Sequence, residues 1–484
     1  MKLSYLSVLL IFLFPVLLFF LTRGVVIHDE GYILHSSERL LNGLIPYRDF
    51  NFVYTPGSLF LTSASFAIFG PSILTSRILM VCIASLSSFL IFKIILISTK
   101  NRFYATLGVF LFVSWGPTHI NFSWPVMYVF LVTFIFCYLL LKFLESKNNL
   151  FLFAAGFTAF TIFVFKQNFG VAIILPIIIF FLTKNFRKMQ HLLTFVCGYL
   201  WGVIGFVIYL LSTTSFPSFL NDFYFFTIHR IIIVPHLTTP FIYFDASLIK
   251  TVFRTTFYLI PLIISVASLF ILFIRKRYHL FFLSAFVISF YFVGIRPTTD
   301  YVHLSPILSL TGIPLTLILR FNTNSILRFI TILSSVILIT LGFHTALHKG
   351  YYRWDDPLVL HNNFFMSPKV NIFLNDKFYN EFSEIIETIN KDTAKGDYIF
   401  VNSYNPMIYF ISDRNDPMRN DFLKTQVDEK EYYEEVLGNL VAKKVRILIL
   451  DYNNLPQLPI KDYVLENYIL TKTIGSFEIY LREN

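Results

Sequence analysis

The chain has 484 residues, of which 56% are hydrophobic and 14% charged, and its mean hydropathy is +0.66. A soluble globular protein carries about 25% charged residues, so this composition excludes the ordinary soluble class. Disordered and disulfide-scaffold proteins are excluded too, because apolar residues dominate and only three cysteines are present. The net charge of +10 does not indicate nucleic-acid binding, because the excess basic residues lie between apolar segments, where they orient a membrane protein.

Eleven apolar segments approach the ~20 residues that a membrane-spanning helix needs. In chain order they are residues 4–22, 73–97, 103–120, 124–144, 150–165, 169–183, 191–212, 251–274, 279–294, 304–319 and 327–344. The first lacks a small-residue cleavage site, so we interpret it as a retained helix rather than a signal peptide. We predict a polytopic α-helical membrane protein of about 11 spans over residues 1–344, followed by a small soluble α/β domain over residues 345–484.

The short loops give this topology an orientation. With the N-terminus in the cytoplasm, each inner loop is basic and includes residues such as Lys100, Lys147, Arg275 and Arg320, as the positive-inside rule requires. The same assignment places seven of the eight carboxylates of residues 1–343 outside, and only Glu145 inside. Two long loops, 23–72 and 213–250, and the C-terminal domain then lie on the extracytoplasmic side.

The outer segments contain recognisable local patterns. Residues 30–43 and 57–69 are candidate interfacial helices in the first outer loop. In the C-terminal domain, apolar residues at helical spacing predict helices around 382–389 and 433–441, and apolar runs predict strands at 398–401, 445–450 and 477–481.

The pair Asp29 and Glu30 is the first candidate for chemistry. It follows the first predicted span by a few residues, and a carboxylate near the membrane is costly unless it has a function. Adjacent residues do not share a helix face, so one carboxylate can face a substrate while the other does something else. The structural alternative is a helix start, with Asp29 as the cap and Glu30 in the first turn. Residues alone leave both interpretations open.

The surrounding motif carries a resemblance. The chain has DEGY after its first span, then LLNGLIPYRDF, YTPGSLFL and FGPSILTSRI. This order resembles the GT-C type membrane glycosyltransferases, in particular the protein O-mannosyltransferase and aminoarabinose transferase superfamily, similar to glycosyltransferase family 39. The resemblance implies a polyprenyl-phosphate sugar donor and places Asp29, with its neighbour Glu30, at the active site. In the same outer loop we expect Asp49 and Tyr54 to contact substrate, although Asp49 can instead brace the loop.

Two positions depart from the pattern of the aminoarabinose transferases. Those enzymes tend to have an arginine after DEG, where this chain has Tyr32, and a Lys-Pro-Pro run where this chain has Thr55-Pro56-Gly57. The departures remove two cations that the resemblance places near the lipid phosphate. Other residues must then supply positive charge.

Two later turns offer that charge. Lys166 and Gln167 lie in the turn KQNFG between two apolar runs, where they can bind a phosphate oxygen and a sugar hydroxyl; the alternative is that Lys166 extends to water. The loop GIRPTTDYVHLSP supplies Arg296, Tyr301 and His303, whose counterpart in the resembled superfamily helps to hold the lipid phosphate. Arg296 can also form a plain ion pair with Asp300.

No metal ligand is assigned. His28, His35 and Asp29 include suitable atoms for a divalent metal, but their spacing matches no strong metal motif. A divalent metal therefore stays an option, and no other cofactor is indicated.

Together these features predict a hexosyl- or pentosyltransferase that moves a sugar from a polyprenyl-phosphate donor to an acceptor hydroxyl with inversion, and Asp29 as the base. The predicted partners are the lipid-linked donor, membrane lipid and a glycan, lipid or protein acceptor, with no nucleic acid. The predicted location is a bacterial inner membrane with the site on its outer side. The alternatives are a transporter or flippase of lipid-linked sugars, and a glycan polymerase or ligase that uses a lipid diphosphate.

Overall fold

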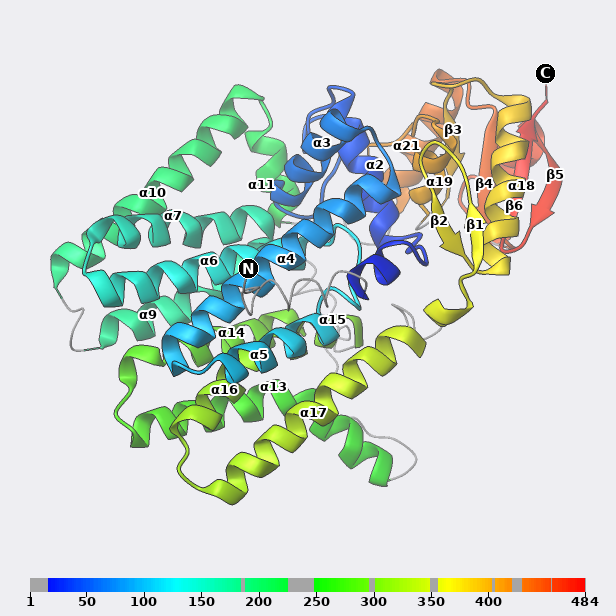
Figure 1. The fold of residues 1–484 in the computed structure, drawn as a ribbon. Coiled ribbons are helices and arrows are strands. Elements are labelled where there is room, and N and C mark those ends of the chain that lie inside the picture. Colours follow the sequence, from blue (N-terminus) through cyan, green and yellow to red (C-terminus); the bar gives the residue numbers. More distant parts are fainter. Residues whose placement is uncertain are drawn as a thin grey trace.

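The computed structural model describes residues 16–183, 188–224, 248–295, 301–348, 356–402, 405–419, 429–453 and 455–483. A bundle of helices makes up most of the molecule, and a small sheet region lies at one end of it (Figure 1). The predicted first span, most of loop 213–250, and Arg296 with Asp300 lie wholly or largely outside the described residues.

The first outer loop forms two helices, α2 (Asp29–Leu41) and α3 (Gly57–Phe69), and leads into the long helix α4 (Ile73–Thr99). Helix α4 begins where the Ser72 side chain accepts a hydrogen bond from Thr75 N at 3.0 Å, which satisfies one of the free N–H groups of its first turn. Both predicted interfacial segments are therefore helical. Helix α3 packs on both α2 and α4, so the loop is a compact structure rather than an open connection.

The bundle continues with helices that follow the apolar segments of the sequence. Their bounds are α5 (Arg102–Trp115), α6 (Pro125–Ser146), α7 (Asn149–Phe165), α8 (Gln167–Ala172), α9 (Ile174–Leu182), α10 (Met189–Ser212), α11 (Phe216–Tyr224), α13 (Leu248–Ile274), α14 (Phe282–Gly294), α15 (Tyr301–Ser309), α16 (Gly312–Phe321) and α17 (Ser325–His348). The predicted segment 103–120 ends early, because α5 stops at Trp115 before Gly116 and Pro117.

Five of these helices are long and apolar enough to cross a membrane: those over 73–99, 125–146, 189–212, 255–274 and 325–348. A sixth span results if α15 and α16, which meet at a 40° bend, are counted as one. Four other predicted spans coincide with shorter apolar helices, at 102–115, 149–165, 167–182 and 278–294. The membrane class of the prediction is confirmed, whereas the length test among the described residues supports at most six full spans.

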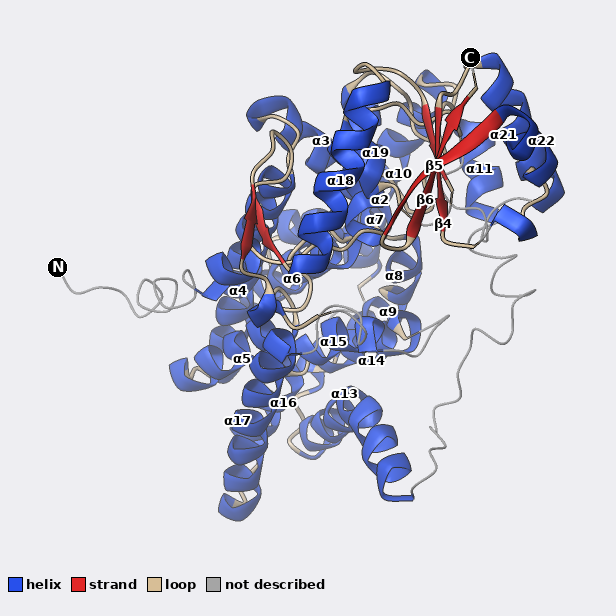
Figure 2. Cartoon of the chain, turned by 90° about the vertical axis from the view of Figure 1, so that its right-hand side faces the viewer, coloured by secondary structure: helices blue, strands red, loops and turns tan. Residues whose placement is uncertain are grey.

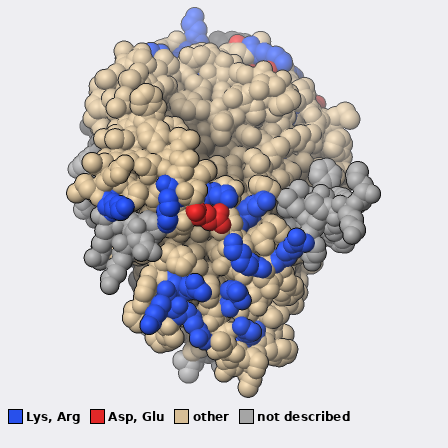
Figure 3. Space-filling model, turned by 60° about the vertical axis from the view of Figure 1, so that its left-hand side comes forward, with Lys and Arg blue, Asp and Glu red and all other residues tan. Residues whose placement is uncertain are grey.

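Basic residues gather at the end of the bundle away from the sheet, around a small acidic patch (Figure 3). Contacts join the loops there: Lys100 after α4 and Lys142 on α6 both pair with Glu145, at 3.9 and 3.0 Å, and Arg275 after α13 donates to Phe321 O at 2.9 Å. The inner loops predicted from the sequence therefore lie together at one end.

The C-terminal sheet has the order β3-β4-β6-β5, with β3 (Ile399–Val401) parallel to β4 (Ile447–Asp451) and with β6 (Phe477–Arg482) antiparallel to both β4 and β5 (Tyr468–Ile474). Helices α18 (Asp376–Asp392) and α19 (Met407–Ser412) cover one face, and α21 (Glu429–Ala442) and α22 (Lys461–Asn467) cover the other (Figure 2). Alternate residues of β4 enter the two cores, which explains why its first four residues are all apolar. The predicted strands and both helices of this region are found.

The sheet region packs directly on the first outer loop. Strands β1 (Asn363–Phe365) and β2 (Ile372–Leu374) form a hairpin that lies beside residues 22–24. Phe373 N donates to Thr22 O at 2.8 Å, and Gly24 N donates to Phe373 O at 3.0 Å. Helix α19 crosses α2 so closely that a Cβ at Gly31 would lie 2.5 Å from Met407 N. The glycine of the DEGY motif is therefore required by this crossing.

A buried ionic network fastens the same contact. Asp416 lies 3.0 Å from Arg39 Nη2 and 3.8 Å from His35 Nε2, and Lys369 pairs with Glu38 at 2.5 Å. Burial, together with Arg39, lowers the pKa of His35 to about 4 against the opposing effect of Asp416, so its ring is neutral at neutral pH. These contacts join residues before and after position 344, where the sequence predicts the boundary between two domains. The division into two domains stays a prediction.

Candidate active site

Asp29 opens helix α2, and Glu30 follows in the same first turn. The free N–H groups and the partial positive charge of a helix start stabilise carboxylates there. Glu30 is buried with 1% exposure, whereas Asp29 is only half-buried. The two acids of the motif therefore have different surroundings.

Glu30 is held by Arg77 of α4. The Arg77 Nε and Nη2 donate to the two Glu30 carboxylate oxygens at 2.7 and 2.8 Å, and the remaining Arg77 donors bind the carbonyls of Leu21, Arg23 and Gly24 at 2.7 to 3.1 Å. Val26 N also donates to Glu30 at 3.2 Å. The pair thus ties the chain of residues 21–26 to α4 and fixes the start of α2, on which Asp29 lies.

Lys166 lies between α7 and α8 in an aromatic surrounding. Its Nζ is 5.3, 5.5 and 5.6 Å from the ring centres of Tyr54, Trp124 and Phe169, distances at which rings attract a cation. Burial of this turn lowers the pKa of Lys166 to about 8, and the Asp29 carboxylate opposes that shift. Lys166 therefore stays largely charged at neutral pH, with Asp29 close enough to act on it electrostatically.

Gln167 holds the outer loop rather than pointing to open space. Its Oε1 accepts from Thr55 N at 3.2 Å, and its Nε2 donates to Val53 O at 2.9 Å. A Cβ at Gly57 would lie 2.8 Å from Val164 O, so the loop passes directly over the end of α7. These contacts place Tyr54, between Val53 and Thr55, beside Lys166.

Tyr32 and Asp49 also support this loop. The Tyr32 hydroxyl accepts from Val53 N at 2.9 Å and lies 3.4 Å from Asn51 O. Asp49 accepts two hydrogen bonds from Arg48 at 2.8 Å and one from Ile45 N at 2.8 Å, and the Arg48 bonds lower the pKa of Asp49 despite partial burial. Tyr32, which stands where the resembled enzymes have an arginine, is therefore a buried side chain that holds the loop in place.

The late outer loop is described only from Tyr301. The Tyr301 ring is 5.6 Å from the ring of His119, and His303 is half-buried two residues later on α15. Helix α15 lies next to the Lys166 turn through α14, because Phe169 contacts Phe290 at 4.8 Å between ring centres. The structure thus brings Asp29, Tyr54 and Lys166 together, and places Tyr301 beside His119, across α14 from this group.

Several residues of the site were not predicted from the sequence. The missed residues are Arg77, which binds Glu30, and two aromatic residues that surround Lys166, Trp124 and Phe169. A neighbouring hollow is lined by His119 and His361. The one signal for Arg77 is that it is one of only two charged residues, with Lys93, in an otherwise largely apolar helix. The aromatic rings gave no signal, because the chain has 59 phenylalanines.

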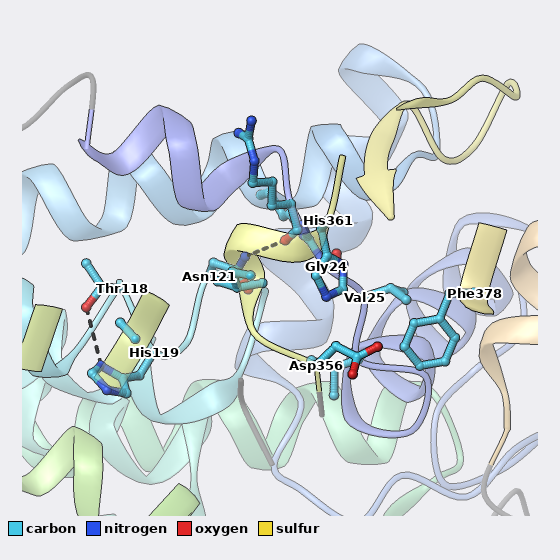
Figure 4. Close-up of a pocket in the computed structure, with 13 residues that line it drawn as sticks. Gly24, Val25, Thr118, His119, Asn121, Asp356, His361 and Phe378 are labelled. Atoms are coloured by element: carbon cyan, nitrogen blue, oxygen red, sulfur yellow. Dashed lines mark hydrogen bonds between the residues drawn. The ribbon is translucent and has the colours of Figure 1, made fainter. Parts of the chain in front are cut away.

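Two adjoining hollows lie beside the segment that leads into α2, and His28 lines the second of them. The first is small and lies between residues 23–26, the loop at His119 and the segment at His361 (Figure 4). The second is larger and reaches from His28 to Asp451 in the sheet region. Both are lined by Val25, Val26, Asp356 and Phe378, so they are neighbouring compartments of one depression.

The described residues include no ligand cluster for the divalent metal that the sequence left as an option. Among the described residues, no group of three or more His, Cys, Asp or Glu side chains is placed to hold a metal ion. His35, a candidate ligand beside Asp29, stacks on Tyr409 at 5.0 Å and faces Asp416.

Comparison with solved structures places this geometry in a known architecture. The chain is similar to ArnT from Cupriavidus metallidurans bound to undecaprenyl phosphate, with a TM-score of 0.59 and 12% sequence identity over 97% of each chain. It is also similar to the apo state of the same protein, with a TM-score of 0.61 and 12% identity over 98% of this chain and 97% of the other. No protein-family model matches the sequence. No curated protein matches it significantly.

The chain has the GT-C type fold. This confirms the fold that the sequence resemblance predicts, over nearly the full length and with the small C-terminal sheet included. An identity of 12% carries the architecture but not the roles of single residues, so those roles rest on the contacts described above.

Proposed function

We propose that this protein is a membrane glycosyltransferase that moves a sugar from a polyprenyl-phosphate donor to an acceptor hydroxyl. The observation that carries the proposal is a half-buried acid, Asp29, that acts electrostatically on a cation enclosed by aromatic rings, Lys166, while His28, next to Asp29 in the chain, lines a polar hollow. The GT-C fold supports it, as does the undecaprenyl phosphate bound to the ArnT structure.

The donor side needs an apolar wall and a cation. The bundle supplies apolar surface for a long lipid, and the phosphate that leaves the sugar is already ionised, so it needs positive charge rather than a proton. Lys166 would supply that charge, with Arg296, Tyr301 and His303 of the late loop as further phosphate ligands. Charge-assisted hydrogen bonds of this kind are stronger than neutral ones.

The acceptor side needs a base. Asp29 would accept the proton of the acceptor hydroxyl as that oxygen attacks the sugar carbon from the face opposite to the phosphate. The bond from carbon to phosphate oxygen breaks as the new bond from carbon to acceptor oxygen forms, so a single displacement inverts the anomeric centre. Glu30, locked by Arg77, would position Asp29 rather than take the proton itself.

The other predicted residues take supporting roles in this proposal. Gln167 and Asp49 would hold the loop that carries Tyr54, and Tyr54 would enclose Lys166 and the sugar. Residues 345–484 would form an extracytoplasmic domain, and the site would lie on the outer face of a bacterial inner membrane. The end of the bundle with the basic loops would then face the cytoplasm, as the positive-inside rule requires.

The deciding experiment measures donor cleavage by the purified protein against a panel of radiolabelled polyprenyl-phosphate sugars. We expect Asp29→Asn to lower the rate by about 10²–10⁴, as removal of a general base does. Asp376→Asn is the matched control, because Asp376 also opens a helix but is exposed and lines neither hollow. Full activity of Asp29→Asn at normal expression would refute the assignment of the base.

The same panel separates the alternative functions. A flippase would move the lipid-linked sugar across a vesicle membrane without releasing phosphate from it. A polymerase or ligase would consume a lipid diphosphate and leave the monophosphate donors intact. In either case donor cleavage would be absent for every monophosphate sugar, and the proposed reaction would fail.

A further inference from the structure

The basic end of the bundle contains a groove that the proposed reaction does not use. It lies between the last turn of α9 and the turn that joins α13 to α14, and encloses about 530 Å³, within the range of small-molecule sites. Phe180 of α9 contacts Phe282 of α14 edge to face at 5.6 Å, so the two sides are held together. The lining includes Ile179, Leu182, Lys276, Tyr278, His279 and Phe281.

The polar part of this groove carries donors and positive charge but no acid. Lys276, Tyr278 and His279 bring an ammonium, a hydroxyl and an imidazole ring to its wall. The sequence has no Asp or Glu over residues 146–221 or over residues 246–299. No carboxylate of either segment can therefore neutralise the groove, and its donors suit a phosphate.

Neighbouring cations add to this positive field. Arg277 and Lys147 both act electrostatically on His279. Lys147 lies on the α9 side, because its Nζ is 5.9 Å from the ring centre of Phe143, which in turn is 6.4 Å from the ring of Phe180. The groove therefore lies among cations contributed by two separate loops, and such a concentration of one sign of charge attracts an anion.

The backbone places lysines at this end in a strained conformation. Lys100, Lys147 and Lys276 lie just after α4, α6 and α13, with φ of 55°, 58° and 52°. Glycine adopts this left-handed conformation without strain and is the usual residue after a helix, whereas a lysine is strained there. A lysine in the last helical turn would complement the helix C-terminus without that strain. The three positions therefore indicate that cations at the tips of these helices have a role beyond helix stability.

An apolar surface leads away from the cations along the outside of the bundle. Leu182 of α9 and Phe273 and Ile274 of α13 are each more than half exposed, and in a membrane protein such side chains face lipid tails. Tyr278 lies at the boundary, with its ring 5.9 Å from Phe273 and 5.5 Å from Phe281. Amphipathic rings of this kind are typical of the headgroup level. The groove thus joins a cationic site to a lipid-facing surface.

We propose that this groove binds an anionic phospholipid, with the headgroup phosphate at Lys276 and His279 and an acyl chain along Leu182 and Phe273. Basic pockets between membrane helices bind anionic lipid headgroups in this way. The apolar surface favours a lipid over free phosphate, because a soluble anion gains nothing from it. The inference does not rest on the proposed function, since the groove lies at the end of the bundle away from the sheet, where the basic residues gather (Figure 3).

The test measures lipid binding to the purified full-length protein in a non-ionic detergent by native mass spectrometry. The probe is dioleoylphosphatidylglycerol, and the control is dioleoylphosphatidylcholine, which has the same tails and no net charge. At about 0.15 M ionic strength, attraction beyond about 8 Å is screened, so a preference reports local contacts. We expect phosphatidylglycerol to bind about tenfold more tightly, because several basic side chains each contribute a few-fold. Equal binding of the two lipids would overturn the proposal.

A soluble headgroup distinguishes a lipid site from a phosphate site. Glycerol 1-phosphate has the phosphate but no tails, and it should bind at least about tenfold more weakly than phosphatidylglycerol, because it cannot bury apolar surface along α9 and α13. Binding of the soluble headgroup as tightly as the lipid would refute the lipid assignment.

Variants locate the bound lipid. Lys276→Gln should reduce the preference for phosphatidylglycerol by about fivefold, the contribution of one basic side chain near an anionic headgroup. Arg102→Gln is the matched control, because Arg102 is exposed at the start of α5, at the same end of the bundle, but does not line the groove. Equal losses in the two variants would mean that the lipid is attracted by the general charge of this end, and would refute the site.

Lys276→Gly separates lipid binding from folding. Glycine relieves the left-handed strain at this position, so the variant should keep at least the heat stability of the wild type in detergent without added lipid. Its preference for phosphatidylglycerol should nevertheless fall by about fivefold, as in Lys276→Gln. A Lys276→Gly protein that keeps the full preference would show that the lysine does not bind the headgroup, and the proposal would fail.

Discussion

The buried pair of Glu30 and Arg77 allows a quantitative prediction. Their side chains are 1% and 0% exposed and meet in a two-point contact of 2.7 and 2.8 Å. Glu30→Gln keeps the shape but removes the negative charge and replaces one of the two acceptor oxygens by an NH2 donor, so the guanidinium keeps one side-chain acceptor and the carbonyls of residues 21, 23 and 24. Removal of one partner from a buried ion pair costs about 3–5 kcal/mol, because the remaining charge is no longer compensated. We expect Glu30→Gln to be destabilised by that amount.

The assay is heat stability of the purified protein, followed by size-exclusion chromatography after heating. Because membrane proteins of this size unfold irreversibly, the half-life at a fixed temperature is the appropriate quantity. The matched control is Glu145→Gln, which breaks an exposed pair with Lys142 at 3.0 Å, and exposed pairs contribute about 0.2–1 kcal/mol. A half-life of Glu30→Gln equal to that of the control would refute the reasoning.

A double-mutant cycle with Arg77→Lys separates the pair from general packing. Lysine keeps the charge but cannot reproduce the two-point contact or reach all three carbonyls at once. The two single changes should therefore be non-additive, with a coupling of about 1–3 kcal/mol. Additive losses would mean that the contact of Glu30 with Arg77 contributes nothing of its own.

Two other predictions concern the contact between the outer loops and the sheet region. Burial raises the pKa of Asp222 from 3.8 to about 6, while Arg419 at 3.4 Å opposes the shift. The folded state therefore binds this proton more tightly than the unfolded state does. Its stability is lost as the pH rises from about 4 to 6. Asp222→Asn should remove this loss and be more stable than wild type at pH 7 in thermal unfolding, and an unchanged pH profile would contradict the shift. Arg39→Met should leave Asp416 buried without its closest cation, cost about 3–5 kcal/mol, and expose α19 to limited proteolysis; wild-type resistance would contradict that role.

The parts of the fold that depend on local sequence were predictable. Ten of the eleven predicted spans coincide with apolar helices, because an uninterrupted apolar run determines a helix in the bilayer without reference to other segments. The strand over 447–451 was found for a similar reason, since it is apolar on both faces. Strand β5 was missed because its middle residues are exposed at the edge of the sheet, so that its pattern resembles a loop.

The sequence predicted which residues belong to the site, but not how they contact one another. The motif around residues 28–57 and the turn at Lys166 indicated which residues carry charge near the membrane surface. It did not indicate that Gln167 binds the backbone of Val53 and Thr55, more than 100 residues earlier in the chain. Such a contact depends on the path of the loop over α7, which no local pattern records.

The sequence by itself determined that this is a polytopic helical membrane protein with an acidic motif after its first span, because those properties follow from apolar length and local order. The GT-C type of architecture was indicated by the resemblance of its motifs to a known superfamily, and the fold confirms it. Only the tertiary structure decided how the two acids of that motif differ. Arg77 lies 47 residues beyond Glu30 and enters its site from another helix, and Lys166 approaches Asp29 from a third. The surroundings of a charge are set by groups that meet in space, so neighbours in the sequence can have unlike roles.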